Sequence, residues 1–248
     1  MLEVHNLMVF FENALALNDF SMEVREGQIV GVIGSNSAGK TTLMNTLSGL
    51  IIDMRIKENR RGGERITVYG TVSFRGQDIT ETKPDERVKK GIVLCRERHP
   101  IFPESAVTEN LKIAGYLKKS SEVRNMVQYV FKLFPTLIHL KTRKAGFLSG
   151  GEQQMLAIGM ALVAQPSLLL LDEPLLGLSP MMQTMLVSAI KSLRDESGIT
   201  VLITEQFARP VLPMLDFGYV VENGMLSLTG TGEELMENSE VRAAYFGV

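Results

Sequence analysis

The sequence is poor in cysteine and in net charge. Cys95 is the single cysteine among 248 residues, so no disulfide can form within the chain, and a reducing compartment fits. The formal net charge of −2 gives no support to bulk nucleic-acid binding, because such binding leaves a basic footprint. The first residues include acidic ones and lack the basic region that begins a secretory signal. We therefore expect neither a nucleic-acid partner nor export.

Long apolar runs are also missing. The most apolar stretch, "SLLLLDEPLLGLSP", is interrupted by Asp172, Glu173 and Pro174, so it is too broken to span a bilayer. The chain is therefore expected to stay out of the membrane by itself, although it could dock onto a protein that spans one. Its 45% apolar and 22% charged residues are ordinary for a globular protein, and its length suits one large α/β domain or a core with a subdomain.

The apolar pattern predicts a parallel sheet with an inserted helical part. The runs "GQIVGVIG", "GIVLC", "SLLLLD" and "ITVLIT" are continuous, as expected for strands buried on both faces. Residues 65–76 alternate and predict a strand or hairpin, whereas residues 108–140 carry apolar side chains at helical spacing. Asn223-Gly224 predicts a hairpin turn. Helices are expected over residues 40–50 and 233–245.

A glycine-rich stretch, "GSNSAGKTT", follows the first buried run. Gly34, Gly39, Lys40 and Thr41 match the pattern G-x-x-x-x-G-K-[ST] between a predicted strand and a predicted helix. Backbone N–H groups of such a loop wrap phosphate oxygens, and the helix N-terminus adds a partial positive charge. We expect Lys40 to reach the β- and γ-phosphates and Thr41 to hold Mg²⁺. A chance glycine turn is the alternative.

Two acids end the run of leucines at residues 168–171. Because ligands of open α/β sheets bind at the carboxyl ends of strands, Asp172 is expected to support Mg²⁺ and Glu173 to polarise an attacking water. The alternative is a simple turn cap, since an acid before proline often starts a turn.

A second glycine-rich stretch, "LSGGEQQ", begins at Leu148. Ser149 and Glu152 form the pattern S-x-x-E, which caps a helix. Capping explains those two residues, but it leaves Gly150 and Gly151 unexplained, because glycine weakens a first turn unless something must approach the backbone. A phosphate is one such group.

In this order, "GSNSAGKTT", "LSGGEQQ" and "LLLLDEP" resemble the nucleotide-binding subunits of ABC transporters over nearly the whole chain. "LDEPLLGLSP", "TEQ" and the tail "EVRAAYFGV" look closest to the smaller ATPase subunit of branched-chain amino acid importers. The resemblance implies one ABC ATPase domain, 1–248, of α/β class. Residues 1–96 and 147–248 would form a RecA-like P-loop core with an antiparallel β subdomain. Residues 97–146 would form the inserted helical subdomain.

The same resemblance implies the site residues and the cofactors ATP and Mg²⁺. In this family two subunits sandwich ATP head to tail, so the two glycine-rich stretches of one chain would serve two different ATP molecules. Those implied to bind the chain's own ATP are Phe11, Gly34, Ser35, Asn36, Ser37, Ala38, Gly39, Lys40, Thr41 and Thr42. Ser149, Gly150 and Gly151 would act on the partner's ATP.

Several positions depart from the family pattern. Phe11 falls where an aromatic residue, usually Tyr, stacks on adenine; Phe10 is the competing candidate, and a packed phenylalanine is the alternative. Glu97 falls where most relatives place a Gln that contacts Mg²⁺, with a surface charged cluster as the alternative. Gln206 replaces a histidine that contacts the γ-phosphate, and its amide can still donate.

Two further departures lie in loops, where Ser37 replaces a common glycine and Pro180 a common Asp. Ser37 is tolerable only if its backbone dihedral angles suit a side chain.

Some features are not assigned a function. The three histidines, His5, His99 and His139, lack metal-ligand spacing. The methionines at 181, 182 and 185 predict packing or partner contact. The basic stretch "MRIKENRRGGER" predicts a solvated loop that is longer than in relatives, with contact to lipid headgroups as the minor alternative.

The resulting hypothesis is a peripheral ATPase at the cytoplasmic face of the cell membrane. It would power uptake of branched-chain or related amino acids together with a second ATPase subunit, two integral membrane permeases and, indirectly, an external solute-binding protein. Importers of urea or short amides are alternatives within transport. A non-transport ABC ATPase is the competing class, and it is disfavoured because the chain has one phosphate loop, one signature and no long heptad region. A phosphate-loop kinase would have no use for "LSGGEQQ".

Overall fold

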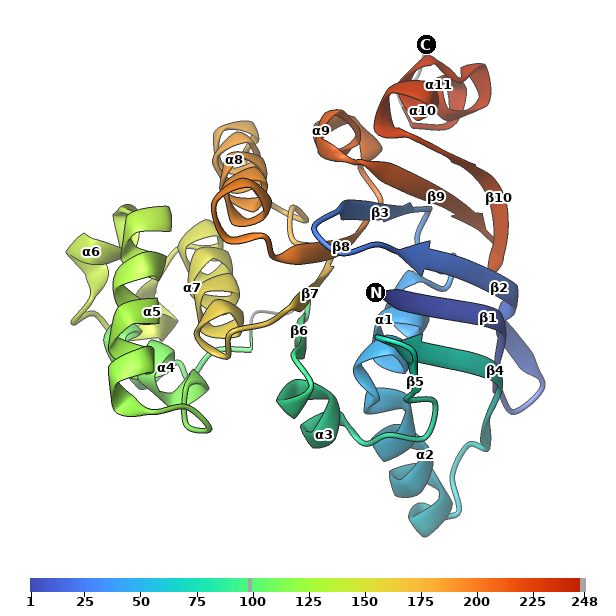
Figure 1. The fold of residues 1–248 in the computed structure, drawn as a ribbon, viewed down its shortest axis with the longest axis horizontal. Helices are drawn as coiled ribbons and strands as arrows, with labels where there is room; N and C mark the ends of the chain where they lie inside the picture. Colours follow the sequence, from blue (N-terminus) through green and yellow to red (C-terminus); the bar gives the residue numbers. More distant parts are fainter. Residues whose placement is uncertain (98–99, 246–248) are drawn as a thin grey trace.

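The computed structural model describes residues 1–97 and 100–245, which form two β-sheets and a group of helices (Figure 1). The strands are β1 Leu2–Phe11, β2 Ala14–Val24, β3 Ile29–Ile33, β4 Ile66–Phe74, β5 Gln77–Asp78, β6 Ile92–Cys95, β7 Leu168–Asp172, β8 Thr200–Glu205, β9 Phe217–Glu222 and β10 Met225–Gly230. The α-helices are α1 Lys40–Ser48, α2 Leu50–Arg61, α3 Pro84–Lys89, α4 Val107–Ala114, α5 Ser120–Leu133, α6 Thr136–Leu140, α7 Gly150–Val163, α8 Pro180–Ser197, α9 Ala208–Val211, α10 Gly232–Glu237 and α11 Ser239–Tyr245. Short 3₁₀ turns, η1 Ala145–Phe147 and η2 Leu212–Met214, complete the described elements.

The larger sheet has the strand order β10-β9-β3-β8-β7-β6. Its strands β9, β3, β8, β7 and β6 run parallel, and β10 joins β9 as an antiparallel hairpin. The hairpin turns at Asn223 and Gly224, both with positive φ, as the Asn-Gly pair predicts. The continuous apolar runs are these parallel strands, and β3, β7 and β8 are buried at every residue.

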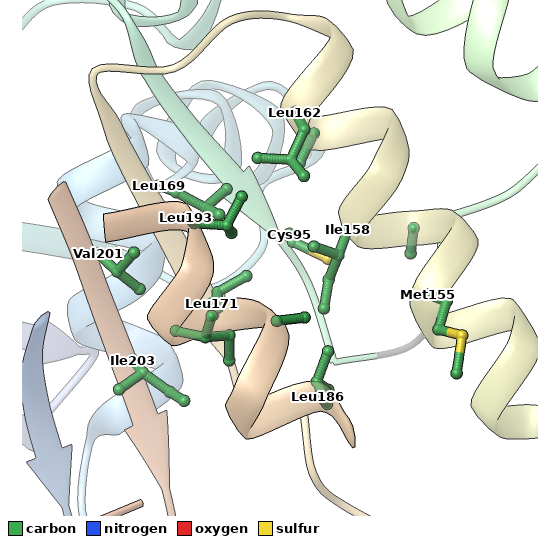
Figure 2. Packing of buried hydrophobic residues seen from close by; sticks show 14 of the residues in the cluster. Cys95, Met155, Ile158, Leu162, Leu169, Leu171, Leu186, Leu193, Val201 and Ile203 are labelled. Carbon is green, nitrogen blue, oxygen red and sulfur yellow. The ribbon is translucent and has the colours of Figure 1, made fainter. Parts of the chain in front are cut away.

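Alternate residues of each parallel strand face two different cores. Leu169 and Leu171 of β7 join a cluster with α7 and α8, whereas Leu168 and Leu170 join a cluster with α1 and the smaller sheet. Figure 2 shows the first cluster, in which Ile158 and Leu162 of α7 and the leucines of α8 surround the residues of β7 and β8. Both faces of the sheet are therefore covered, which fixes its carboxyl edge as the open place for a ligand.

The smaller sheet is antiparallel, with the order β2-β1-β4-β5. The alternating stretch at residues 65–76 supplies β4 and, after a turn at Arg75 and Gly76, pairs with the two-residue strand β5. The expected hairpin is therefore present, although its second strand is short.

A helical segment separates two neighbouring strands. β6 and β7 pair in parallel, yet α4, α5, α6 and α7 lie between them in the chain and gather at one end of the molecule (Figure 1). The apolar stripe of α5 is buried at Val123, Val127, Val130 and Phe131, as its spacing predicts. The exact subdomain boundaries at residues 97 and 146 stay a prediction.

Three local expectations were wrong in part. The helix predicted over residues 40–50 breaks at Gly49, and the basic stretch continues as α2 through Arg61 in place of a loop. Residues 50–61 contain neither glycine nor proline, Ile51 and Ile52 bury one face, and Arg60 and Arg61 complement the helix C-terminus. The closing helix is likewise divided, into α10 and α11. Among the described helices, none is both long and apolar enough to cross a bilayer.

Candidate nucleotide site

The loop between β3 and α1 requires glycine at its two ends. A Cβ on Gly34 would lie 2.6 Å from the carbonyl oxygen of Val221, and a Cβ on Gly39 would lie 2.6 Å from that of Ala16. Gly39 also has a φ of +99°, which side chains rarely adopt. The loop therefore turns tightly against the neighbouring hairpins and opens onto the N-terminus of α1. Ser37 sits at its centre with a φ of +66°, so it occupies the left-handed region that the family's glycine would favour.

Lys40, the first residue of α1, is buried, and its ammonium group is held by hydrogen bonds and an ion pair. Its ammonium group donates to the carbonyl oxygens of Gly34 and Ser35, both at 2.8 Å. Its Nζ also lies 2.9 Å from Oε1 of Glu173, and the two side chains are only 3% and 8% exposed. Burial excludes much of the water that weakens surface ion pairs, so this pair joins the glycine-rich loop firmly to the end of β7.

Asp172 ends β7 beside the hydroxyl groups of Thr41 and Thr204. Thr204 Oγ1 donates to Asp172 Oδ1 at 2.7 Å. Burial raises the pKa of Asp172; hydrogen bonds from Thr204 and Thr41 oppose the rise, while the nearby charges of Glu173 and Glu97 add to it. A divalent cation at this position would favour the charged carboxylate, because it supplies the positive charge that burial removes.

A cavity of about 360 Å³ opens at this edge of the sheet. The residues that line it are Ala16, Asn36, Ser37, Gly39, Lys40, Thr41, Thr42, Glu97, Glu173 and Leu176. The structure thus brings the glycine-rich loop, Glu97 and Glu173 together around one polar space, although they come from three separate stretches of the sequence.

Comparison with known proteins identifies the family. Residues 17–176 match the family model described as "ABC transporter". This chain belongs to the ABC transporter family. The branched-chain amino acid transport ATP-binding protein BraG of Pseudomonas aeruginosa is 37% identical over the full length of both chains. The probable branched-chain amino acid transport ATP-binding protein LivF of Archaeoglobus fulgidus is 33% identical over all of this chain and 99% of its own.

A solved structure agrees with the sequence matches. A crystal structure of the ADP conformation of an ATP-binding cassette from an ABC transporter is 29% identical, with a TM-score of 0.82 over 100% of this chain and 99% of the other. The fold is therefore that of an ABC ATPase, an ATP-hydrolysing subunit, and the cavity at the glycine-rich loop is its candidate nucleotide site.

Five residues predicted to contact nucleotide are not among those lining the cavity: Gly34, Ser35 and Ala38 of the glycine-rich loop, and Phe11 and Gln206, which lie outside that loop. Phe11 is half-buried at the end of β1 and packs against the core shared with the smaller sheet. Its competitor Phe10 makes an edge-to-face contact with Tyr69, with ring centroids 6.1 Å apart. Gln206 is half-buried just beyond β8. Their roles stay predictions.

The signature stretch begins α7 with the expected capping box. Ser149 Oγ accepts from Glu152 N at 3.4 Å, and Glu152 Oε2 accepts from Ser149 N at 2.7 Å. Packing explains only one of the two glycines: a Cβ on Gly151 would lie 2.5 Å from the Met182 side chain, whereas a Cβ on Gly150 would meet open space. Ser149, Gly150 and Gly151 are absent from the cavity lining, as expected if they serve another subunit's nucleotide.

Thr204 and Glu205 contact Asp172 or the turn after it, and the sequence analysis did not single them out. Thr204 bonds Asp172, and the buried carboxyl of Glu205 accepts a hydrogen bond from Leu175 N at 2.8 Å. The available signal was two polar residues at the end of the apolar run "ITVLITE", at the same edge of the sheet as Asp172 and Glu173.

The side chains beside the cavity are of the kind that the expected Mg²⁺ would need. Within residues 1–97 and 100–245, no group of three or more His, Cys, Asp or Glu is placed to hold a metal without other ligands. Mg²⁺ in a nucleotide site would need only one or two protein oxygens, because phosphates and water complete its shell. Thr41 and Asp172, which bond each other, offer those oxygens.

Proposed function

We propose that this chain is the ATPase subunit of an importer for branched-chain or related amino acids. The observation that carries the proposal is the buried contact of Lys40 with Glu173 inside the cavity, together with the full-length similarity to BraG and LivF. The cargo assignment rests on the names of those relatives, since the ATPase would not touch the cargo. Urea or short amides remain the alternative cargo.

The glycine-rich loop and Lys40 would bind the phosphates of ATP. Backbone N–H groups of residues 34–42 would face the phosphate oxygens, and the Lys40 ammonium would exchange its carbonyl partners for β- and γ-phosphate oxygens. Thr41 and Asp172 would hold Mg²⁺, with Glu97 beside them, and the ion would neutralise phosphate charge.

Glu173 would act on the attacking water. Its carboxylate borders the cavity and is held by Lys40, so it could orient a water toward the γ-phosphorus and take up its proton as the bond from that phosphorus to the bridging oxygen breaks. Gln206 would donate to the γ-phosphate.

A second ATPase subunit would complete each site. Phe11 would stack on adenine of the chain's own ATP. The exposed Ser149 and Gly150 would close on the partner's ATP, because no described residue lies within 4 Å of a Cβ added to Gly150. The segment at residues 97–146 would then move as a helical subdomain when the pair closes.

Each ATPase subunit of the pair would dock one of the two permeases, and in this chain the docking surface would be a groove between α3 and the helical segment. This cavity of about 230 Å³ is lined by Val88, Lys89, Ala114, Tyr116, Leu117, Lys118 and Ala164. Exposed apolar side chains flanked by lysines suit an amphipathic permease helix at the cytoplasmic face of the membrane, with an external binding protein delivering the solute.

The test is a mild-detergent pull-down of the tagged chain from native membranes. Recovery of two multi-span permeases and a second ATPase supports the importer, and the co-purified binding protein can be tested for branched-chain amino acids. Recovery of ribosomal or DNA-bound proteins without an integral membrane partner would overturn the transport assignment.

The chemical role of Glu173 is tested separately with Glu173→Gln. This variant should keep ATP binding within about twofold and lose about a hundredfold or more in turnover. Glu64→Gln, at an exposed position, is the matched control. Retained turnover in the Glu173→Gln variant would remove Glu173 as the base.

A further inference from the structure

Glu205 is a buried acid without an assigned role that lies behind the candidate nucleotide site, in contact with the backbone of the glycine-rich loop and of the turn after β7. It ends β8, the strand between β3 and β7, and is 1% exposed. Burial raises its pKa to about 8; hydrogen bonds from the backbone N–H groups of Leu175 and Gln206 oppose the rise, as does Lys40, while the charge of Glu173 adds to it. Burying a carboxyl group costs free energy, and a leucine would fill the same space without that cost. Packing alone therefore does not explain an acid at this position.

The contacts of Glu205 reach two motifs at once. Its carbonyl oxygen accepts a hydrogen bond from Gly34 N at 3.1 Å, at the start of the glycine-rich loop. Its side-chain Oε1 accepts one from Leu175 N at 2.8 Å, in the turn that follows Glu173. Gln206, predicted to sense the γ-phosphate, is its direct chain neighbour.

The turn that carries Glu173 needs external support. Glu173 has a φ of +46°, a left-handed conformation that costs a side-chain-bearing residue free energy and persists only where its surroundings enforce it. Thr204 accepts hydrogen bonds from Glu173 N through its carbonyl oxygen and its hydroxyl, at 3.1 and 3.2 Å. Pro174 has no N–H to offer, so the bond from Leu175 N to Glu205 is the next anchor along the turn.

We propose that Glu205 is a positioning residue for ATP hydrolysis, whose carboxyl oxygen holds the turn after β7 so that Glu173 faces the attacking water. The proposal rests on the proposed role of Glu173. The phosphates are held by other groups, so loss of Glu205 should lower kcat and leave nucleotide binding nearly intact.

The experiment compares Glu205→Gln with Glu205→Leu in the chain assembled with its partner subunits. Glutamine keeps the acceptor oxygen and leucine removes it at similar volume. Leucine leaves the N–H of Leu175 without its acceptor, so a thermal unfolding curve of each variant first establishes that it is folded at the assay temperature. We expect kcat within about threefold of wild type for Gln and reduced about thirtyfold for Leu, with the KM for MgATP within about threefold in both.

A double-mutant cycle separates this role from a general structural one. If Glu205 acts through Glu173, Glu205→Leu should change turnover by less than about twofold when Glu173→Gln is already present. An equal loss in both backgrounds, an unchanged kcat in the leucine variant, or an equal loss in the glutamine variant would overturn the proposal. Failure of Glu173→Gln alone to reduce turnover would instead refute the proposed base.

Discussion

At the scale of single residues, burial controls the chemistry around the cavity. Burial raises the pKa of Asp172 and Glu205, and it raises the pKa of the Cys95 thiol to about 12. Cys95 is therefore an inert core residue at the end of β6, as its place among α7 and β7 residues in Figure 2 illustrates. Thr204 donates a hydrogen bond to Asp172, and Lys40 forms an ion pair with Glu173, so the two acids at the end of β7 each have a partner.

Replacing Ser37 by glycine should stabilise the protein. The φ of +66° costs Ser37 roughly 1–2 kcal/mol relative to right-handed backbone, whereas glycine adds about 0.5–1 kcal/mol of unfolding entropy. Ser37→Gly should therefore raise the free energy of unfolding by about 0.5–1 kcal/mol, measured by denaturant titration. Ser35→Gly, two positions earlier at negative φ, should lower it by a similar amount. A gain in both variants or in neither would contradict the strain at Ser37.

The pH dependence of stability should carry the signature of Glu205. Its pKa rises from 4.5 to about 8 on folding, so the native state binds the extra proton between these values. Its contribution is fully present below about pH 4.5 and is lost as the pH rises through about 8. Relative to Glu205→Gln, the free energy of unfolding of the wild-type protein should therefore fall as the pH rises from about 5 to about 8.5. Denaturant titrations of both proteins across that pH range would measure this difference. A constant difference would show that Glu205 is charged in the native state.

Sequence reasoning found the loop residues but missed Glu205. Gly34, Gly39, Lys40 and Thr41 lie within one short stretch, and their spacing matches a pattern that can be recognised without knowing their distant contacts. The role of Glu205 depends on Leu175, thirty residues away in the chain, and no local pattern reports which backbone N–H a buried acid will meet.

At the scale of elements, the N-termini of α7 and α8 are capped in the same way. Ser149 caps α7 and Ser179 caps α8, each accepting from an N–H three residues later. Pro180 occupies the first helical position of α8, where its missing N–H costs nothing, so the departure from the family's Asp is compatible with the helix. Met182 of α8 then packs against Gly151 of α7, which places the two helix starts in contact.

Two glycines of α7 should respond in opposite ways to alanine. A Cβ at Gly150 meets open space, so Gly150→Ala should raise the free energy of unfolding by up to about 1 kcal/mol through helix propensity. Its ATPase activity in the assembled transporter should nevertheless fall about tenfold or more, because the methyl group would lie where the partner's phosphate approaches. Gly159→Ala is the matched change, and it should lower stability, since its Cβ would lie 2.7 Å from Val130. Full activity of Gly150→Ala would contradict close approach at Gly150.

The basic stretch was predicted to be a loop, but most of it forms the helix α2. Arginines, lysines and two glycines suggested a loop, but the glycines lie beyond the C-terminus, and Gly62 ends the helix with a φ of +64°. Helix propensity and the two buried isoleucines carried more weight than charge. Arg55 forms an ion pair with Glu81 in the segment before α3, while Ile51 and Ile52 hold the first turn of α2 in the core.

At the scale of the whole molecule, the order of motifs along the chain predicted the architecture. Continuous apolar runs gave the parallel strands, and helical spacing gave the segment between β6 and β7. The pairing order of the strands could not be obtained in this way, because it depends on which distant edges meet. Arg87 of α3 illustrates such a contact: it is buried and donates to the carbonyl oxygens of Thr46 and Leu47 at the end of α1, so the groove near α3 is joined to the helix that follows the glycine-rich loop.

A charge placed in the groove between α3 and the helical segment should prevent assembly without unfolding the subunit. Tyr116 is 81% exposed there, so Tyr116→Glu should leave the melting temperature within about 2 °C of wild type. If a permease helix packs on this groove, the variant would lose the apolar contact of the Tyr116 ring and would have to desolvate a carboxylate beside Lys89 and Lys118, so recovery of permeases in the pull-down should fall about tenfold or more.

Tyr69→Glu is the matched control for that experiment. Tyr69 is 54% exposed on β4 of the smaller sheet and lines no part of the groove, so permease recovery should be unchanged. Equal loss of permeases in both variants would point to a general effect of added charge. Full recovery with Tyr116→Glu would move the permease contact to another surface, because a helix seated against residue 116 would lose its contact with the aromatic ring and would bury a charge.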